Sequence, residues 1–361
     1  MNADLAQPPL RKKQKLYTVR FEIPWPWKII FAALAAAILL LFQTPALQRR
    51  FLDTLSPVLD PVLLRIRLHR FERITGIRGF SELPDNGFLV ATGYRVYYLR
   101  PSSEIPTEYR IVYDYKTYKE HFEGKPPSIS TASFPSENHF LLGTWRGRIL
   151  QYRNGRWSST SLTQEKGRRV VGLALDGESI ICAGYDGVFS IPFDGIVHRA
   201  SEPRSAEGLA RAPDGTFWCW NYRTLYRREG TGPDARWVPV WTLPSQAVAI
   251  ESLAFSKNEI FVGTKKSGIL RLDSRYRILG KELPGIWINA IAVESKTGTI
   301  AAGAWNRDGL FVKRGTRWKQ YRPVLGLPLK DIFTLFIDDS GRLWIGPYGG
   351  SLMVIALEDL P

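Results

Sequence analysis

Residues 331–355 read DIFTLFIDDSGRLWIGPYGGSLMVI, which is the pattern of three short β-strands. Residues 332–337 are apolar at nearly every position, and such a run suits a strand that is buried on both faces. The turn cluster DDSG at 338–341 separates it from the apolar run 343–346, and a glycine pair then leads into the run 351–355. Three strands alone cannot cover their own apolar faces, so we expect similar units beside this one.

The rest of the chain contains further copies of this sequence pattern. When each copy is aligned on the glycine that follows its second apolar run, seven copies recur at intervals of 36 to 50 residues. The aligned positions are Gly93, Gly143, Gly184, Trp220, Gly263, Gly303 and Gly346. Four-stranded propeller blades have periods of about 40–50 residues. The sequence therefore predicts an all-β fold, a seven-bladed β-propeller. The alternative, a β-sandwich, does not explain seven copies of one sequence pattern.

The last copy carries a distinctive set of residues: Leu327-Pro328, Asp338, Gly341, the run LWIG at 343–346 and Gly349-Gly350. This set resembles the two-component regulator propeller repeat, which is found in the extracytoplasmic sensor regions of some bacterial two-component proteins. The resemblance covers about residues 74–356 and is weaker in the other copies, of which the fourth has Trp220 at the aligned position. It implies a propeller fold and suggests sensing, but propellers host many activities.

Residues 29–47, IIFAALAAAILLLFQTPAL, contain no charged side chain. About 20 apolar residues span a bilayer as a helix, so this run predicts a single N-terminal transmembrane helix before the propeller. Residues 1–28 carry six Lys and Arg residues, and the positive-inside rule places this basic tail in the cytoplasm, near anionic lipid headgroups. We expect an uncleaved, single-pass signal anchor in a bacterial inner membrane, with the propeller in the periplasm. The alternative is a cleaved signal peptide, although its n-region would be unusually long.

Two segments connect the predicted anchor to the first blade. Residues 48–61 form a juxtamembrane segment whose apolar residues recur at helical spacing. Residues 62–71 alternate apolar and polar side chains from Leu64 onward, which is the pattern of an edge strand. Because the last copy of the repeat shows only three strands, we predict that residues 62–71 supply its fourth strand. This strand would close the ring of a propeller domain spanning 62–361 and remove its exposed strand edges.

The sequence gives little sign of metal binding or catalysis. Cys182 and Cys219 are the only cysteines, and we expect free, buried thiols on opposite faces of their blades rather than a disulfide. The four histidines show no metal-ligand spacing, and the chain has no GxSxG, HExxH or phosphate-loop motif. We therefore predict no metal, no cofactor and no catalytic residue. A propeller lyase or hydrolase whose active site is assembled from several blades stays open as an alternative.

Two sets of residues have structural interpretations. Trp157, Trp237 and Trp318 each follow a turn that opens an outermost strand, and we expect them to pack between blades. Asp338 and Asp339 lie in a tight turn, where Asp side chains cap the backbone. A calcium site would need more oxygen ligands than the sequence DDSG offers.

The loops that follow each second strand are the candidate binding site, because in a propeller they open on one face around the central channel. Their aromatic and basic residues are Tyr94, Arg95, Trp145, Arg146, Tyr185, Tyr222, Arg223, Lys265, Lys266, Trp305, Arg307 and Tyr348. Aromatic rings stack on sugars or peptide side chains and bind cations, and Arg binds carboxylate or phosphate. We predict a binding face here, with packing between blades as the alternative for any single residue.

The net charge also bears on the partner. The chain carries a net charge of +15, of which the first 47 residues contribute +4, so the predicted ectodomain carries +11. A basic ectodomain favours an anionic partner such as an anionic glycan, lipid headgroups or an acidic protein, and we expect no nucleic-acid partner.

These observations favour a binding or scaffold protein. We expect an accessory subunit of an envelope or membrane complex, with a membrane or periplasmic protein as partner. Two alternatives remain. One is a ligand-sensing subunit that signals through a membrane partner, because the 361 residues contain no kinase and no Tyr-rich module. The other is a propeller-fold lyase or hydrolase.

Overall fold

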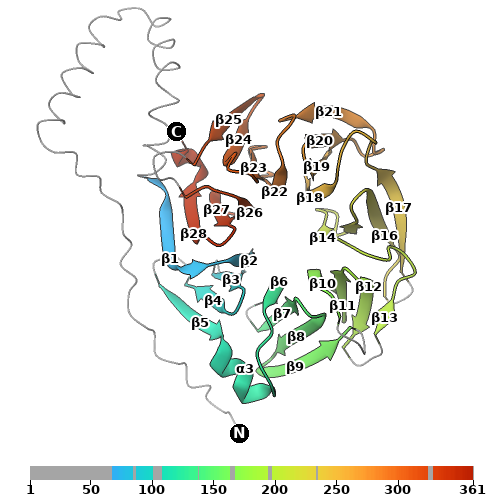
Figure 1. Ribbon diagram of the computed structural model, residues 1–361, viewed down its shortest axis with the longest axis vertical. Helices are drawn as coiled ribbons and strands as arrows, with labels where there is room; N and C mark the ends of the chain where they lie inside the picture. The colour runs from blue at the N-terminus through green and yellow to red at the C-terminus, as the bar shows by residue number, and fades with distance from the viewer. Residues whose placement is uncertain are drawn as a thin grey trace, which may run out of the picture.

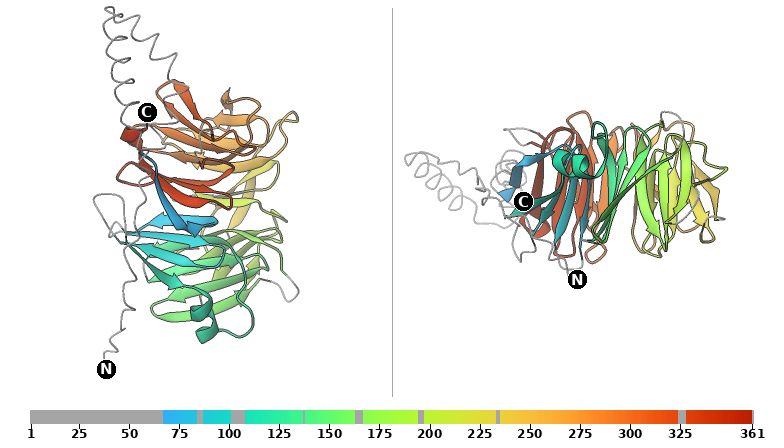
Figure 2. Two further views of the ribbon diagram at one scale, coloured as in Figure 1. Left: turned by 60° about the vertical axis from the view of Figure 1, so that its left-hand side comes forward. Right: turned by 90° about the horizontal axis from the view of Figure 1, so that it is seen from below.

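The computed structural model describes residues 67–83, 87–100, 108–136, 138–162, 167–193, 197–232, 235–323 and 328–360 of the chain. In these residues the strands form seven four-stranded sheets, which surround a central axis (Figure 1). Neighbouring strands within each sheet are antiparallel. The protein is therefore an all-β, seven-bladed propeller, as the repeat predicts. Seen from the side, the blades stand next to one another around the ring (Figure 2).

The first three blades each consist of four consecutive strands, counted from the channel outward. Blade 1 contains β2 (Ile77–Glu82), β3 (Phe88–Thr92), β4 (Val96–Leu99) and β5 (Tyr109–Tyr113). Blade 2 contains β6 (Ile129–Ser136), β7 (His139–Thr144), β8 (Arg148–Arg153) and β9 (Arg156–Ser161). Blade 3 contains β10 (Val170–Asp176), β11 (Ser179–Gly184), β12 (Gly187–Pro192) and β13 (His198–Arg199). The short helix α3 (Tyr115–His121) lies in the connection between blades 1 and 2.

The next three blades follow the same plan. Blade 4 contains β14 (Gly208–Arg211), β15 (Phe217–Trp220), β16 (Thr224–Glu229) and β17 (Arg236–Thr242). Blade 5 contains β18 (Ile250–Phe255), β19 (Ile260–Thr264), β20 (Gly268–Leu272) and β21 (Ile278–Glu282). Blade 6 contains β22 (Ile288–Val293), β23 (Ile300–Ala304), β24 (Leu310–Arg314) and β25 (Arg317–Tyr321).

Blade 7 is built from two distant parts of the sequence. It contains β26 (Ile332–Ile337), β27 (Arg342–Pro347) and β28 (Ser351–Ala356), followed by the short 3-10 helix η1 (Leu357–Asp359). Its outermost strand is β1 (His69–Thr75), which precedes blade 1 in the sequence and pairs with β28 (Figure 1). An N-terminal strand therefore completes the last blade. It begins at His69 and runs to Thr75, so it overlaps the range expected for it, 62–71, only at its start, and residues 62–66 lie outside the described residues.

The apolar core lies between neighbouring blades. Trp344 of blade 7 stacks on Phe88 of blade 1, with ring centroids 4.2 Å apart. Trp157, Trp237 and Trp318 each contribute to the apolar layer between their own blade and the preceding one. This placement confirms that the three tryptophans pack between blades.

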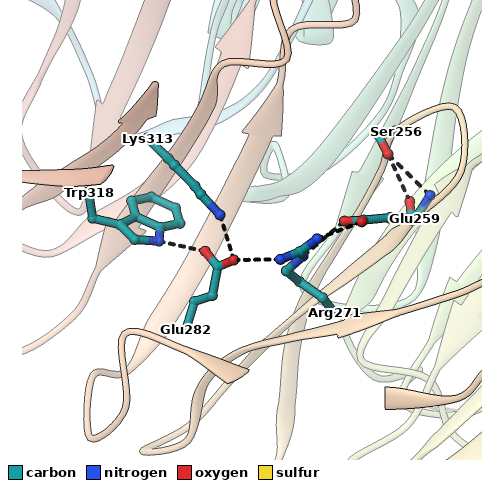
Figure 3. Close-up of polar contacts among 6 residues, drawn as sticks. All are labelled: Ser256, Glu259, Arg271, Glu282, Lys313 and Trp318. Atoms are coloured by element: carbon teal, nitrogen blue, oxygen red, sulfur yellow. Dashed lines mark hydrogen bonds and ion pairs between the residues drawn. The ribbon is translucent and has the colours of Figure 1, made fainter. Parts of the chain in front are cut away.

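A polar network adds to the contact between blades 5 and 6 (Figure 3). The carboxylate of Glu282 accepts hydrogen bonds from Nζ of Lys313 and Nε1 of Trp318, each at 2.5 Å. It also pairs with Arg271 at 3.1 Å, and Arg271 in turn pairs with Glu259 at 2.6 Å. Glu282 belongs to blade 5, whereas Lys313 and Trp318 belong to blade 6, so the network joins the outer strands of the two blades.

The turn in the last blade confirms the capping role of its first aspartate. Asp338 is almost fully buried, and its Oδ1 accepts hydrogen bonds from the backbone N–H groups of Ser340 and Arg342 at 3.1 and 2.9 Å. Its Oδ2 accepts from Nε of Arg342 at 2.6 Å and from the indole N–H of Trp344 at 2.7 Å. One carboxylate therefore fixes both the turn and the tryptophan of the repeat.

Strand pairing corrects part of the repeat alignment. Four of the aligned glycines occupy equivalent places, since each pairs with the third residue of the innermost strand of its blade. They are Gly143, Gly263, Gly303 and Gly346. In blade 1 that place belongs to Ala91, and in blade 3 it belongs to Ala183, so Gly93 and Gly184 lie beyond the true equivalent position. The error arose because both blades also carry a glycine one or two residues further along, Gly184 at the end of β11 and Gly93 just after β3.

The same shift explains the two cysteines. Both are free and buried, as expected, and burial raises the pKa of each thiol. The expectation of opposite faces is wrong. Cys182 packs with Leu141 of blade 2, and Cys219 packs with Ile181 of blade 3, so each thiol faces the preceding blade. Correcting the blade 3 alignment by one residue makes the two cysteines equivalent.

No helix in the described residues is both long and apolar enough to cross a bilayer. The predicted tail (1–28), anchor (29–47) and juxtamembrane segment (48–61) lie outside those residues.

Candidate binding site at the channel mouth

A repeated irregularity places one side chain per blade in the central channel. In six blades the pairing of the innermost strand with its neighbour shifts after the first residue of that strand. Such a bulge leaves one residue unpaired and redirects its side chain. The unpaired residues are Arg78, Ser130, Val171, Glu251, Asn289 and Phe333, and Glu207 takes the corresponding place before β14. All seven line one cavity of about 470 Å³, which we call the channel cavity.

Two arginines form the cationic part of the channel cavity. The guanidinium of Arg169 lies over the ring of Trp145, 4.4 Å from its centroid. The guanidinium of Arg78 lies 5.5 Å from the centroid of Phe333 and 5.9 Å from that of Tyr348. Burial lowers the pKa of Arg78, and the nearby charge of Arg169 lowers it further. Among the described residues neither arginine has an ion-pair partner, and the Nε of each is buried without a hydrogen bond.

Two carboxylates form the anionic part. Burial raises the pKa of Glu207, while the hydroxyls of Tyr222 and Tyr185 and the charge of Arg169 act in the opposite direction. Burial also raises the pKa of Glu251; the charge of Lys265 opposes this effect and that of Glu207 adds to it. The two acidic side chains therefore lie close enough to influence each other's ionisation.

Aromatic rings lie beside the cavity on blades 6 and 7, and of these only Phe333 lines it. Successive ring centroids of Trp287, Trp305, Tyr348 and Phe333 lie 5.9, 5.4 and 6.2 Å apart. The ammonium of Lys265 lies 4.4 Å from the centroid of Trp287. These distances are typical of stacked and edge-to-face pairs, so the rings support one another in a continuous wall.

The loops predicted as the binding face surround this cavity. They connect the second and third strands of the seven blades, and we call them together the channel-mouth face. Tyr185 lines the channel cavity itself, and Trp145 and Tyr348 contact side chains that line it. Lys265 acts on the lining carboxylate of Glu251, and Trp305 lies one ring further out, against Tyr348. Tyr222 acts on Glu207 and Tyr94 acts on Arg78, so seven of the predicted residues are brought together here.

Other predicted residues lie apart from the cavity or have structural partners. Arg223 donates hydrogen bonds to the backbone carbonyls of Leu243, Pro244 and Ala247, so it holds the connection between blades 4 and 5. Arg95 donates to the hydroxyl of Tyr97 at 3.5 Å, a contact that raises the pKa of Arg95. Arg146, Lys266 and Arg307 are exposed and do not line the cavity.

Sequence reasoning missed the inner ring of the site. Arg78, Arg169, Glu207, Glu251 and Trp287 were not among the predicted residues. A signal was present, since Arg78 and Glu251 are charged residues directly after the isoleucine that begins an innermost strand. A charge in that place is costly unless the backbone turns it away from the core.

The described residues contain no group of three or more His, Cys, Asp or Glu side chains that could hold a metal ion. The channel cavity presents a cationic sector and an anionic sector, and the aromatic wall begins at its lining residue Phe333. Guanidinium forks bind carboxylate or phosphate, carboxylates bind ammonium groups, and aromatic faces stack on flat or apolar groups. The arrangement is suited to recognition of a ligand that has more than one kind of chemical group.

The repeat and the fold are shared with known proteins. The family described as two component regulator propeller matches residues 326–349, which confirms the resemblance of the last repeat. No curated protein sequence matches the chain. In contrast, 1402 chains of solved structures match, so structural similarity here identifies a widely used fold and not one function.

Three of these structures show the range of proteins with this fold. The extracellular domain of the putative one-component system BT4673 from B. thetaiotaomicron has a TM-score of 0.61 and 15% identity, over 80% of this chain and 39% of that chain. PorZ, described as an essential surface component of the type-IX secretion system of Porphyromonas gingivalis, has a TM-score of 0.61 and 17% identity over 78% and 46%. Streptogramin B lyase has a TM-score of 0.60 and 13% identity over 80% and 96%. The chain thus spans less than half the length of the first two.

Proposed function

We propose that this propeller is a non-catalytic binding module outside the cytoplasm, which recognises its partner through the channel-mouth face. The observation that carries the proposal is the ring of seven side chains, one from each blade, that converge on the channel cavity. A concave site with a few converging polar groups, some of them with shifted pKa values, is the usual form of a binding pocket.

Sequence features support a membrane-bound accessory subunit. The uncharged run 29–47 and the basic tail before it favour a single-pass anchor with the propeller in the periplasm. The two component regulator propeller repeat and the fold shared with the extracellular domain of BT4673 favour the same side of the membrane. PorZ belongs to a secretion system and has a similar fold, which supports a role within an envelope complex.

The repeat also favours a second candidate, a sensing subunit. In that case the propeller binds a ligand and passes the signal to a membrane partner. The net charge of +11 beyond residue 47 favours an anionic partner in either case, such as an acidic protein or an anionic glycan.

The test is purification of the full-length protein from its native membrane in mild detergent, with mass spectrometry of the proteins that come with it. We expect a stoichiometric partner that is lost when Trp305 and Tyr348 are both changed to Ala. The control is Tyr115→Ala, which removes from α3 on the rim an aromatic side chain that is as exposed as Tyr348 (Figure 1). Equal recovery of the partner with both variants would contradict the role of the channel-mouth face.

A further inference from the structure

We propose that the channel cavity binds a small zwitterionic ligand, a free amino acid or dipeptide, with its carboxylate on Arg78 and Arg169 and its ammonium group at Glu207 and Glu251. The proposal rests on the function proposed above, since it names the ligand of the same face. The volume of about 470 Å³ lies within the range of roughly 300–1,000 Å³ that is usual for small-ligand pockets.

The two arginines are arranged to receive an anion. Aromatic rings cover the faces of both guanidinium groups, through Trp145 on one side and Phe333 on the other. A guanidinium that is stacked in this way keeps the N–H groups at its edge available for a bidentate contact with a carboxylate. Both Nε atoms are buried and have no hydrogen-bond partner in the described part of the chain.

The two carboxylates are arranged to receive a cation. Neither Glu207 nor Glu251 forms an ion pair within the described residues, although both are partly buried and each is close to a further charge. The charge of Lys265 acts on Glu251, but the ammonium group of Lys265 lies over the ring of Trp287. Two neighbouring carboxylates repel each other, and an ammonium group between them would replace this repulsion with two attractive contacts.

The order of these groups around the ring selects a ligand with charges of both signs. Arg78 and Arg169 come from blade 1 and from the start of blade 3, whereas Glu207 and Glu251 come from blades 4 and 5. The aromatic wall occupies blades 6 and 7. A simple anion would satisfy only the first sector and a simple amine only the second. A free amino acid or dipeptide carries a carboxylate, an ammonium group and a side chain, which correspond to the three sectors.

The test uses full-length protein in mild detergent and isothermal titration calorimetry with a panel of dipeptides Gly-X, where X is aromatic, aliphatic, polar or acidic. At least one free dipeptide should bind. Its N-acetylated form and its C-terminal amide should each bind at least about tenfold more weakly, because each loses one charge-assisted contact of ~1.5–3 kcal/mol. Equal binding of a capped form, or no binding by any member of the panel, would overturn the proposal.

Variants distinguish the two subsites. Arg78→Gln should weaken the binding of the free dipeptide and of its N-acetylated form. Glu251→Gln should weaken the binding of the free dipeptide and of its C-terminal amide. Lys257→Gln, in the exposed turn between β18 and β19, is the control and should leave all affinities unchanged. If dipeptides fail to bind while the Trp305 and Tyr348 double variant still loses its protein partner, the ligand assignment is wrong and the proposed function stands.

Discussion

At the scale of single residues, two partly buried carboxylates have opposite electrostatic surroundings. Burial alone would raise the pKa of Glu282, but the hydrogen bonds from Lys313 and Trp318 outweigh it and lower the pKa. Burial raises the pKa of Glu251, because the charge of Lys265 is not enough to offset it. A carboxylate with a lowered pKa stabilises the folded state when ionised, whereas one with a raised pKa costs stability when ionised.

This contrast predicts opposite effects of the same substitution. Glu282→Gln should lower the melting temperature at pH 7. The loss should shrink as the pH falls below 4.5, the ordinary pKa of this carboxyl in the unfolded chain, and vanish below its lowered pKa in the folded protein. Glu251→Gln should leave the melting temperature at pH 7 unchanged or raise it by on the order of 1 °C, and this gain should vanish toward pH 4. Thermal melting of the full-length protein at pH 4, 5.5 and 7 tests both. Losses of equal size for the two variants at pH 7 would contradict the assignment.

At the scale of elements, the contact between the two inner strands of each blade depends on small residues. In most blades the second strand carries a small residue where it meets the innermost strand, but blade 4 has Trp220 there. The facing residue on β14 is Gly208, and a Cβ atom at that position would overlap the indole of Trp220. The glycine thus makes room for the tryptophan, which also lines the channel cavity.

Gly208→Ala should therefore lower the free energy of unfolding by about 1–3 kcal/mol, the usual cost of overpacking a core. Gly280→Ala is the matched control, because no atom lies within 4 Å of a Cβ built there. Chemical denaturation followed by tryptophan fluorescence measures both changes. If the two variants lose the same stability, the close contact between residues 208 and 220 has no special importance.

At the scale of the whole molecule, the ring depends on its first strand. β1 buries Phe71 and Ile74 against blades 7 and 1. Ile74→Ala should cost about 2–5 kcal/mol of stability for the full ring, because it leaves a cavity at the seam. Thr75→Ala, which changes the exposed neighbouring side chain, should cost much less. The melting temperatures of the two full-length variants test this prediction. A similar loss of stability in both would mean that packing of β1 against blades 7 and 1 contributes little.

The number of blades could be predicted from the sequence, whereas the charges of Arg78 and Glu251 are the sole signal there for the inner ring of the site. The repeat is visible because the second strand of each blade is buried on both faces and ends at a small residue, as in LWIG at 343–346. A glycine one or two residues further along imitates that signal, as Gly93 and Gly184 do. The channel residues depend on a bulge, which is a property of strand pairing and not of residue type. For this reason Glu251 and Arg78 were missed while Trp305 and Tyr348, which lie in loops, were found.

The pairing of β1 with β28 also determines when the ring can form. His69 pairs with Val354, so the contact joins residues separated by nearly the whole propeller sequence. Contacts between such distant residues are slow to form, since the entropy of closing a long loop opposes them. During synthesis β1 is made first, but it cannot pair until β28, the last strand, has been made. Until the ribosome has added β28, every nascent form of this propeller is an open arc with two free edges.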